Sequence, residues 1–106
     1  MESTKYTLKF ADGEETKLTL NFAALYALSA ENHELYEVFN KVATEGTNDI
    51  IEYLKVLYIG YRCANGESMT FENFLIRLPM DIPYCVKLVL QLITPPKKAE
   101  TSETAL

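Results

Sequence analysis

The alternation of apolar and polar residues changes its period once along the chain. In the first part, apolar side chains recur at every second position, at Tyr6, Leu8 and Phe10 and again at Leu18, Leu20 and Phe22. This alternation is typical of β-strands. Between the two stretches, Asp12-Gly13 suits a tight turn that needs a positive φ. The sequence therefore predicts an N-terminal β-hairpin, whose apolar face must be covered by helices or by strands of another subunit.

From Asn21 onward the apolar positions recur at the period of an α-helix. Residues that favour helix ends divide this part into about five helices, with Asn21, Asn32, Thr70 and Asp81 as N-caps and Gly46 as a stop. In the first helix, Phe22, Leu25, Tyr26 and Leu28 are expected to form one face. The second helix is predicted to cover the central one from outside. We therefore expect a mainly α (α+β) fold, packed round a central helix at about 47–65.

This fold is expected to form a single domain over residues 1–94. The segment 95–106 is rich in Pro, Lys, Glu, Ser and Thr and has little apolar surface to bury. It is predicted to be disordered.

Two of the expected helices carry more apolar surface than one neighbour can cover. The central helix has a second apolar side, and the last helix has an apolar arc of about 240°, against the ~100° of an ordinary surface helix. This excess of apolar surface predicts that each of these helices has neighbours on two sides or contacts another molecule. The residues nominated for partner binding or self-association are Val56, Ile59, Tyr84, Leu88 and Leu92. Gly60, inside the central helix, predicts a close approach by another backbone.

Charge and composition exclude several classes of partner. The formal net charge of −5 and the lack of a basic helix face argue against nucleic acid. No apolar run approaches the ~20 residues that span a bilayer, and the first residues do not resemble a secretion signal. We therefore expect a cytosolic protein without a membrane contact. Cys63 and Cys85 are predicted to be buried thiols.

No pattern of residues predicts catalysis, a metal site or a cofactor. His33 is the only histidine and lies among glutamates, which favours a solvated or capping role. The four glycines form neither a dinucleotide-binding nor a phosphate-binding pattern. We therefore predict that the chain is not an enzyme.

Four segments of the chain resemble a known family. They are residues 6–13 (YTLKFADG), 18–28 (LTLNFAALYAL), 57–65 (LYIGYRCAN) and 69–75 (MTFENFL). Together they resemble the tail assembly chaperones of long-tailed bacteriophages of Gram-positive hosts, in order and spacing over residues 5 to 94. One departure is Arg77, in a segment that is usually more acidic in this family, and it leaves open which face meets a partner.

The resemblance implies a non-enzymatic role in virion assembly. Proteins of this family bind the tape measure protein, keep it soluble, help to recruit tail tube subunits and leave before the virion is complete. The expected location is the host bacterial cytoplasm, and self-association is expected. The alternative is a small helical regulatory or adaptor protein that acts through protein–protein contacts.

Overall fold

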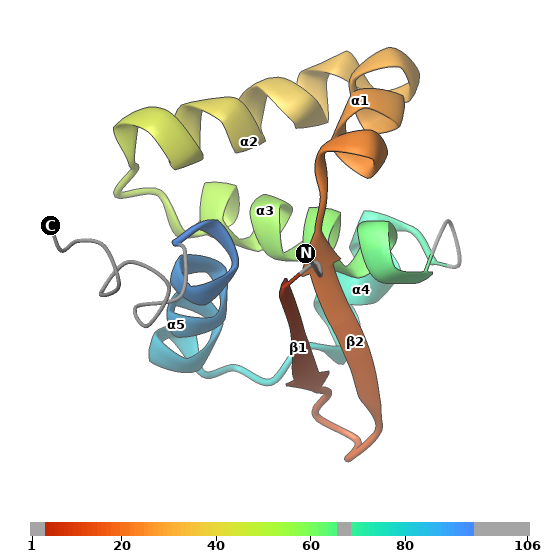
Figure 1. Cartoon of the computed structure of the whole chain (residues 1–106). Coiled ribbons are helices and arrows are strands. Elements are labelled where there is room, and N and C mark those ends of the chain that lie inside the picture. The colour runs from red at the N-terminus through yellow and green to blue at the C-terminus, as the bar shows by residue number, and fades with distance from the viewer. Residues whose placement is uncertain (1–3, 66–68, 95–106) are drawn as a thin grey trace, which may run out of the picture.

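The computed structural model describes residues 4–65 and 69–94. The elements follow in the order β1 (Thr4–Lys9), β2 (Glu15–Leu20), α1 (Phe22–Glu31), α2 (His33–Glu45), α3 (Ile50–Asn65), α4 (Phe71–Arg77) and α5 (Ile82–Ile93). Figure 1 shows α3 in the middle, with α1 and α2 above it and the hairpin and α5 below it. The predicted fold class is confirmed. The predicted disordered tail lies outside the described residues.

The hairpin is antiparallel, with Thr4 opposite Leu20 and Lys9 opposite Glu15. Gly13 has φ +95°, as the predicted turn requires. Leu8 and Leu18 are fully buried, because alternate residues of a strand face the same side and this side packs on the helices. Helices of the same chain therefore cover the apolar face of the hairpin.

The predicted capping residues begin their helices as expected. Each side chain accepts a hydrogen bond from a backbone N–H three residues later: Asn21 from Ala24 at 2.8 Å, Asn32 from Leu35 at 3.1 Å, Thr70 from Asn73 at 3.1 Å and Asp81 from Tyr84 at 3.2 Å. Gly46 ends α2 with φ +82°.

The central helix begins at Ile50, later than the expected position 47. The reason lies in the turn before it. The Thr47 hydroxyl accepts a hydrogen bond from the Asp49 N–H at 3.0 Å, and the Asp49 carboxylate accepts one from the Ile51 N–H at 2.9 Å. Asp49 therefore binds a backbone N–H of the first helical turn that has no partner within the helix. Thr47 stabilises the loop turn that precedes the helix.

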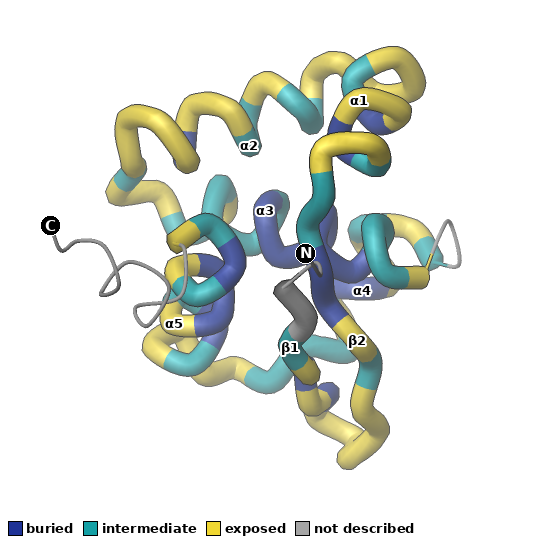
Figure 2. The backbone as a smooth tube through the Cα atoms, viewed as in Figure 1, coloured by how far each residue is buried: buried dark blue, intermediate teal, exposed yellow. Residues whose placement is uncertain are grey.

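Both apolar sides of α3 are covered within the chain. Val56 and Ile59 have no exposed surface. Val56 belongs to the main core cluster with the hairpin, α4 and α5, and Ile59 packs with Leu25 and Leu28 of α1. Figure 2 shows α3 as the most deeply buried helix. The surplus apolar side of α3 therefore marks a central position in the fold.

Gly60 of α3 lies against a side chain of α5. A Cβ atom at this position would lie 2.9 Å from Cδ1 of Leu92 and 3.7 Å from Cβ of Leu18. Leu92 thus inserts its methyl groups where α3 has no side chain, and Leu18 brings β2 close to the same position. No helix in residues 4–65 and 69–94 is long and apolar enough to cross a membrane.

Candidate functional site

Four of the five nominated contact residues are buried in the core. Val56 and Ile59 are 0% exposed, Leu88 is 6% and Leu92 is 7% exposed. Tyr84 is half-buried, and its hydroxyl accepts a hydrogen bond from the backbone N–H of Lys9 at 3.0 Å. The folded chain does not offer the first four to a partner. The reason is that α5 and the hairpin cover one side of α3 and α1 covers the other.

The exposed apolar side chains belong to other residues. Met80 is 91% exposed, Phe22 90%, Tyr26 79% and Ile76 77%. On α5, the exposed part of the apolar arc includes Ile82 and Leu90, which are each nearly half exposed. The exposed apolar surface expected on α5 is therefore present, but at positions other than Leu88 and Leu92.

The outer side of α1 forms a continuous uncharged surface. The expected single face of this helix divides in two, because Leu25 and Leu28 point into the core while Phe22 and Tyr26 lie outside. At 100° per residue the exposed side chains share one arc. We call this surface the α1 face; it consists of Phe22, Ala23, Tyr26, Ala27 and Ala30.

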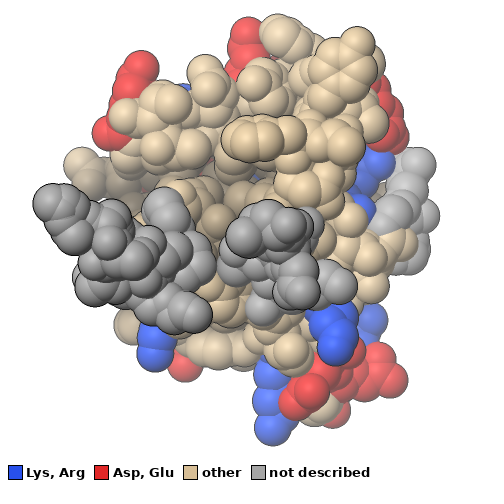
Figure 3. Space-filling model, in the orientation of Figure 1, with Lys and Arg blue, Asp and Glu red and all other residues tan. Residues whose placement is uncertain are grey.

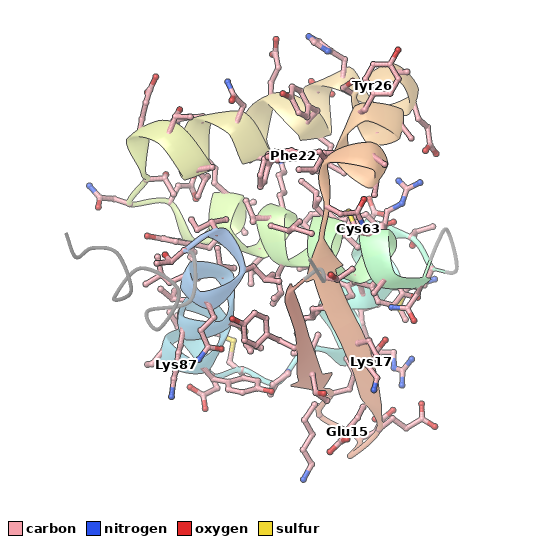
Figure 4. All side chains as sticks on the ribbon, viewed as in Figure 1. Glu15, Lys17, Phe22, Tyr26, Cys63 and Lys87 are labelled. Carbon is pink, nitrogen blue, oxygen red and sulfur yellow. The ribbon has the colours of Figure 1, made fainter. Side chains whose placement is uncertain are left out.

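The figures show the setting of the α1 face. In Figure 3 the charged atoms leave the surface over α1 mostly free and gather at the margins. In Figure 4 Tyr26 points away from α3. The helix has no acidic residue in its first turn and no basic residue in its last. The α1 face is therefore suited to an apolar contact without charge pairing.

A groove of about 740 Å³ lies between α2, α3 and the start of α4. Its walls are mixed, with apolar side chains from all three helical segments beside polar and charged ones, and the apolar part can take the side chains of a bound helix. We call it the α2–α3 groove; its apolar lining consists of Leu35, Val38, Tyr58, Met69 and Phe71. Polar lining comes from Asn32, Glu34, Lys55, Arg62 and Thr70.

The polar side chains of the groove differ in their bonding. Arg62 is mostly buried, donates a hydrogen bond to Glu31 at 2.7 Å and lies 5.8 Å from the centre of the Tyr58 ring. The Tyr58 hydroxyl donates to the carbonyl oxygen of Met69 at 2.7 Å. Lys55 is half-buried and makes no ion pair or hydrogen bond with the residues that the structure describes. The groove therefore combines apolar and polar walls with Lys55, a cation that can receive an acidic group.

Both cysteines are free thiols. Cys85 is buried, whereas Cys63 is half-buried beside a smaller cavity of about 260 Å³ between α1 and α3. Burial raises the pKa of each thiol. Because the thiolate is the reactive form, the higher pKa disfavours nucleophilic chemistry at these residues.

His33 lies on the surface, with Nε2 3.0 Å from a carboxylate oxygen of Glu37. Of the two roles predicted for His33, the solvated one is found, and Asn32 is the cap of α2. Among residues 4–65 and 69–94, no group of three or more His, Cys, Asp or Glu side chains could hold a metal ion.

Sequence reasoning missed the α2–α3 groove and the outward position of Phe22 and Tyr26. One signal for the α1 face was available, since residues 22–30 contain no charge. The groove had no comparable signal, because its lining comes from three segments that only the fold brings together. Comparison with protein-family models, curated proteins and solved structures gave no match to this chain.

Proposed function

We propose that the chain is a non-enzymatic tail assembly chaperone that holds an apolar helical segment of a long client in the α2–α3 groove. The client is the tape measure protein of a long-tailed bacteriophage, and the complex helps to recruit tail tube subunits in the host cytoplasm. The groove, with its apolar side chains and the Lys55 ammonium at its wall, is the observation that carries the proposal. The sequence resemblance supplies the identity of the client.

The lining of the groove supports a helical client. An amphipathic helix presents apolar side chains at every third or fourth position, and such a stripe fits a trough between two helices. Val38 of α2 and Phe71 of α4 supply apolar surface for this stripe. Lys55 can pair with an acidic residue at the edge of the stripe, which would fix the register of the client helix.

A holding role also agrees with the small size of the groove. One groove of about 740 Å³ takes only a few side chains, so each contact with the client is weak. Many copies bound along one long chain can still mask its apolar stripes, because each tethered contact raises the effective concentration of the next. Weak single contacts would also allow the copies to leave when the tube assembles.

Co-expression with the tape measure protein of the same phage tests the proposal. The soluble fraction of the tape measure protein should rise when the chain is present. Lys55→Glu should reduce this rise, because it places a negative charge in the groove. Lys87→Glu is the matched control, since Lys87 is exposed on α5 and the change in net charge is the same.

The two variants distinguish an effect at the α2–α3 groove from a general effect of net charge on solubility. Equal loss in both variants would assign the effect to net charge and remove the groove from the proposal. No rise in solubility with the unsubstituted chain would contradict the function itself. The gene order offers an independent check, because a tube protein gene upstream and a very long helical reading frame downstream are expected.

A further inference from the structure

We infer that two copies of this chain associate through the α1 face, with the two α1 helices antiparallel. The occupant of the α1 face is thus α1 of a second copy. The inference concerns the chain alone and goes beyond the proposed function, since it needs no client. Only its consequence, that paired copies hold a client more tightly, rests on the proposed function.

The first observation is the exposure of two aromatic rings on one side of one helix. Phe22 and Tyr26 are 90% and 79% exposed and lie one helical turn apart. Exposed apolar surface of this kind, gathered in one place, is typical of interaction sites. Because residues 22–30 carry no charge, a second copy of the same surface meets no like charge within the contact itself, although each chain has a net charge of −5.

The second observation is the distribution of large and small side chains along the α1 face. Phe22 stands at its N-terminal end and Ala30 at its C-terminal end, with Tyr26 midway. Antiparallel packing about Tyr26 sets Phe22 of each copy at the level of Ala30 of the other. The small side chain leaves room for the ring, so the surface is complementary to itself, as a two-fold interface requires.

The charges at the helix end favour the same orientation. Glu31 closes α1, and the first turn of the helix has no acidic residue. In an antiparallel pair each Glu31 lies near the positive N-terminal end of the partner helix, whereas a parallel pair would bring two Glu31 side chains together. Glu31 keeps its pair with Arg62, at 2.7 Å, at the edge of this contact.

The size of the contact sets its strength. A helix of 10 residues is about 15 Å long, so the α1 face buries less than the ~800 Å² per partner of a standard interface. We therefore expect a weak and reversible dimer, with a dissociation constant on the order of 10⁻⁴ M. Each dimer carries two α2–α3 grooves.

Sedimentation velocity of the purified chain at rising concentration tests the dimer. The average mass should rise toward twice that of the monomer. Phe22→Glu with Tyr26→Glu should abolish the rise. Ile76→Glu with Met80→Glu is the matched control, because both residues are exposed and apolar and the change in charge is equal. Circular dichroism of both double variants checks that the fold is kept.

Two results would overturn the dimer through the α1 face. The first is a mass that stays at the monomer value at the highest concentration. The second is a dimer that survives the α1 substitutions or is lost only in the control. No client is present in any arm, so failure here leaves the proposed function untouched, and failure of the co-expression experiment leaves this inference untouched.

Oxidative cross-linking tests the orientation. A mixture of Phe22→Cys and Ala30→Cys chains should form mixed disulfide dimers faster than Phe22→Cys forms dimers alone. Cys63 and Cys85 are present in every sample, so their reactions cancel in the comparison. Faster self-linking of Phe22→Cys would indicate a parallel pair and overturn the antiparallel arrangement.

Discussion

Cδ1 of Leu92 in α5 lies 2.9 Å from the point where Gly60 of α3 would carry a Cβ atom. The absence of a side chain at position 60 thus lets α5 pack closely on the central helix. Glycine costs about 1 kcal/mol against alanine inside a helix. The fold accepts this cost at Gly60 because Leu92 occupies the space and is 7% exposed.

The two residues should therefore be coupled in stability. Leu92→Ala should lower the free energy of unfolding by about 2–4 kcal/mol, since it leaves a cavity. Gly60→Ala should change it by less than about 1 kcal/mol, because the gain in helix propensity offsets the crowding of a flexible methyl group.

The double variant gives the decisive comparison. It should be more stable than the sum of the single changes by roughly 0.5–1.5 kcal/mol, because the new methyl group fills part of the cavity. Urea unfolding of the four proteins measures this difference. Strict additivity would show that the two side chains do not share the space.

Removal of a phenylalanine ring should lower stability strongly at one position and hardly at all at another. Phe74 is fully buried and packs edge-to-face with Phe10 at a ring distance of 6.0 Å. Phe74→Ala should cost about 3–5 kcal/mol of stability. Phe22→Ala, at a residue that is 90% exposed, should change stability by less than about 0.5 kcal/mol. Thermal unfolding at low protein concentration checks both, and a large loss at Phe22 would place that ring in the core.

Asn65 should stabilise the contact between α3 and β2. Its side-chain amide donates hydrogen bonds to the Thr16 hydroxyl at 3.1 Å, the Lys17 carbonyl at 3.0 Å and the Tyr61 carbonyl at 2.9 Å. Asn65→Ala should lower stability by about 1 kcal/mol and increase amide exchange in β2. Hydrogen exchange measured by NMR locates the effect. Unchanged exchange in β2 with faster exchange elsewhere would contradict this role.

Acid should weaken the start of α3 through Glu52. Hydrogen bonds from Thr47 and then Lys41 hold the pKa of Glu52 below its usual value of 4.5. A carboxylate with a lowered pKa in the folded state stabilises the fold above its unfolded-state pKa, and this contribution is lost as the pH falls through the folded-state value. The melting temperature should therefore fall as the pH drops below about 4.5.

Glu52→Gln provides the control for this pH dependence. Glutamine keeps a hydrogen-bonding side chain but does not titrate in this range. The variant should start with a lower melting temperature at neutral pH and lose less of it on acidification. Calorimetry at several pH values between neutral and about pH 3 measures the slope. Equal slopes for both proteins would assign the acid sensitivity to other carboxylates, such as Asp12.

Local signals in the sequence were sufficient for much of the fold. The hairpin turn at Gly13 and the caps at Asn21 and Asp81 depend on residues within a few positions of each other, so their chemistry can be predicted from the sequence alone. The start of α3 was less certain, since Thr47, Asn48 and Asp49 can all cap a helix and the turn geometry decides between them.

Four of the five predicted contact residues are buried for a physical reason. Helical periodicity identifies the apolar sides of α3 and α5, but it does not say which neighbour covers each side. The structure covers Ile59 with α1 and places Leu92 against Gly60, so neither is available to a partner. Phe22 and Tyr26 fall within the apolar arc of α1, and only the packing of α1 on α3 shows that they remain outside.

The central claim is that a helical client occupies the α2–α3 groove. NMR chemical shifts of the chain, recorded while a soluble fragment of the tape measure protein is added, test this claim most directly. The largest changes should map to Leu35, Val38, Lys55 and Phe71 and should weaken in Lys55→Glu but persist in Lys87→Glu. Changes confined to Ile82 and Leu90 on α5, or no changes at all, would contradict it.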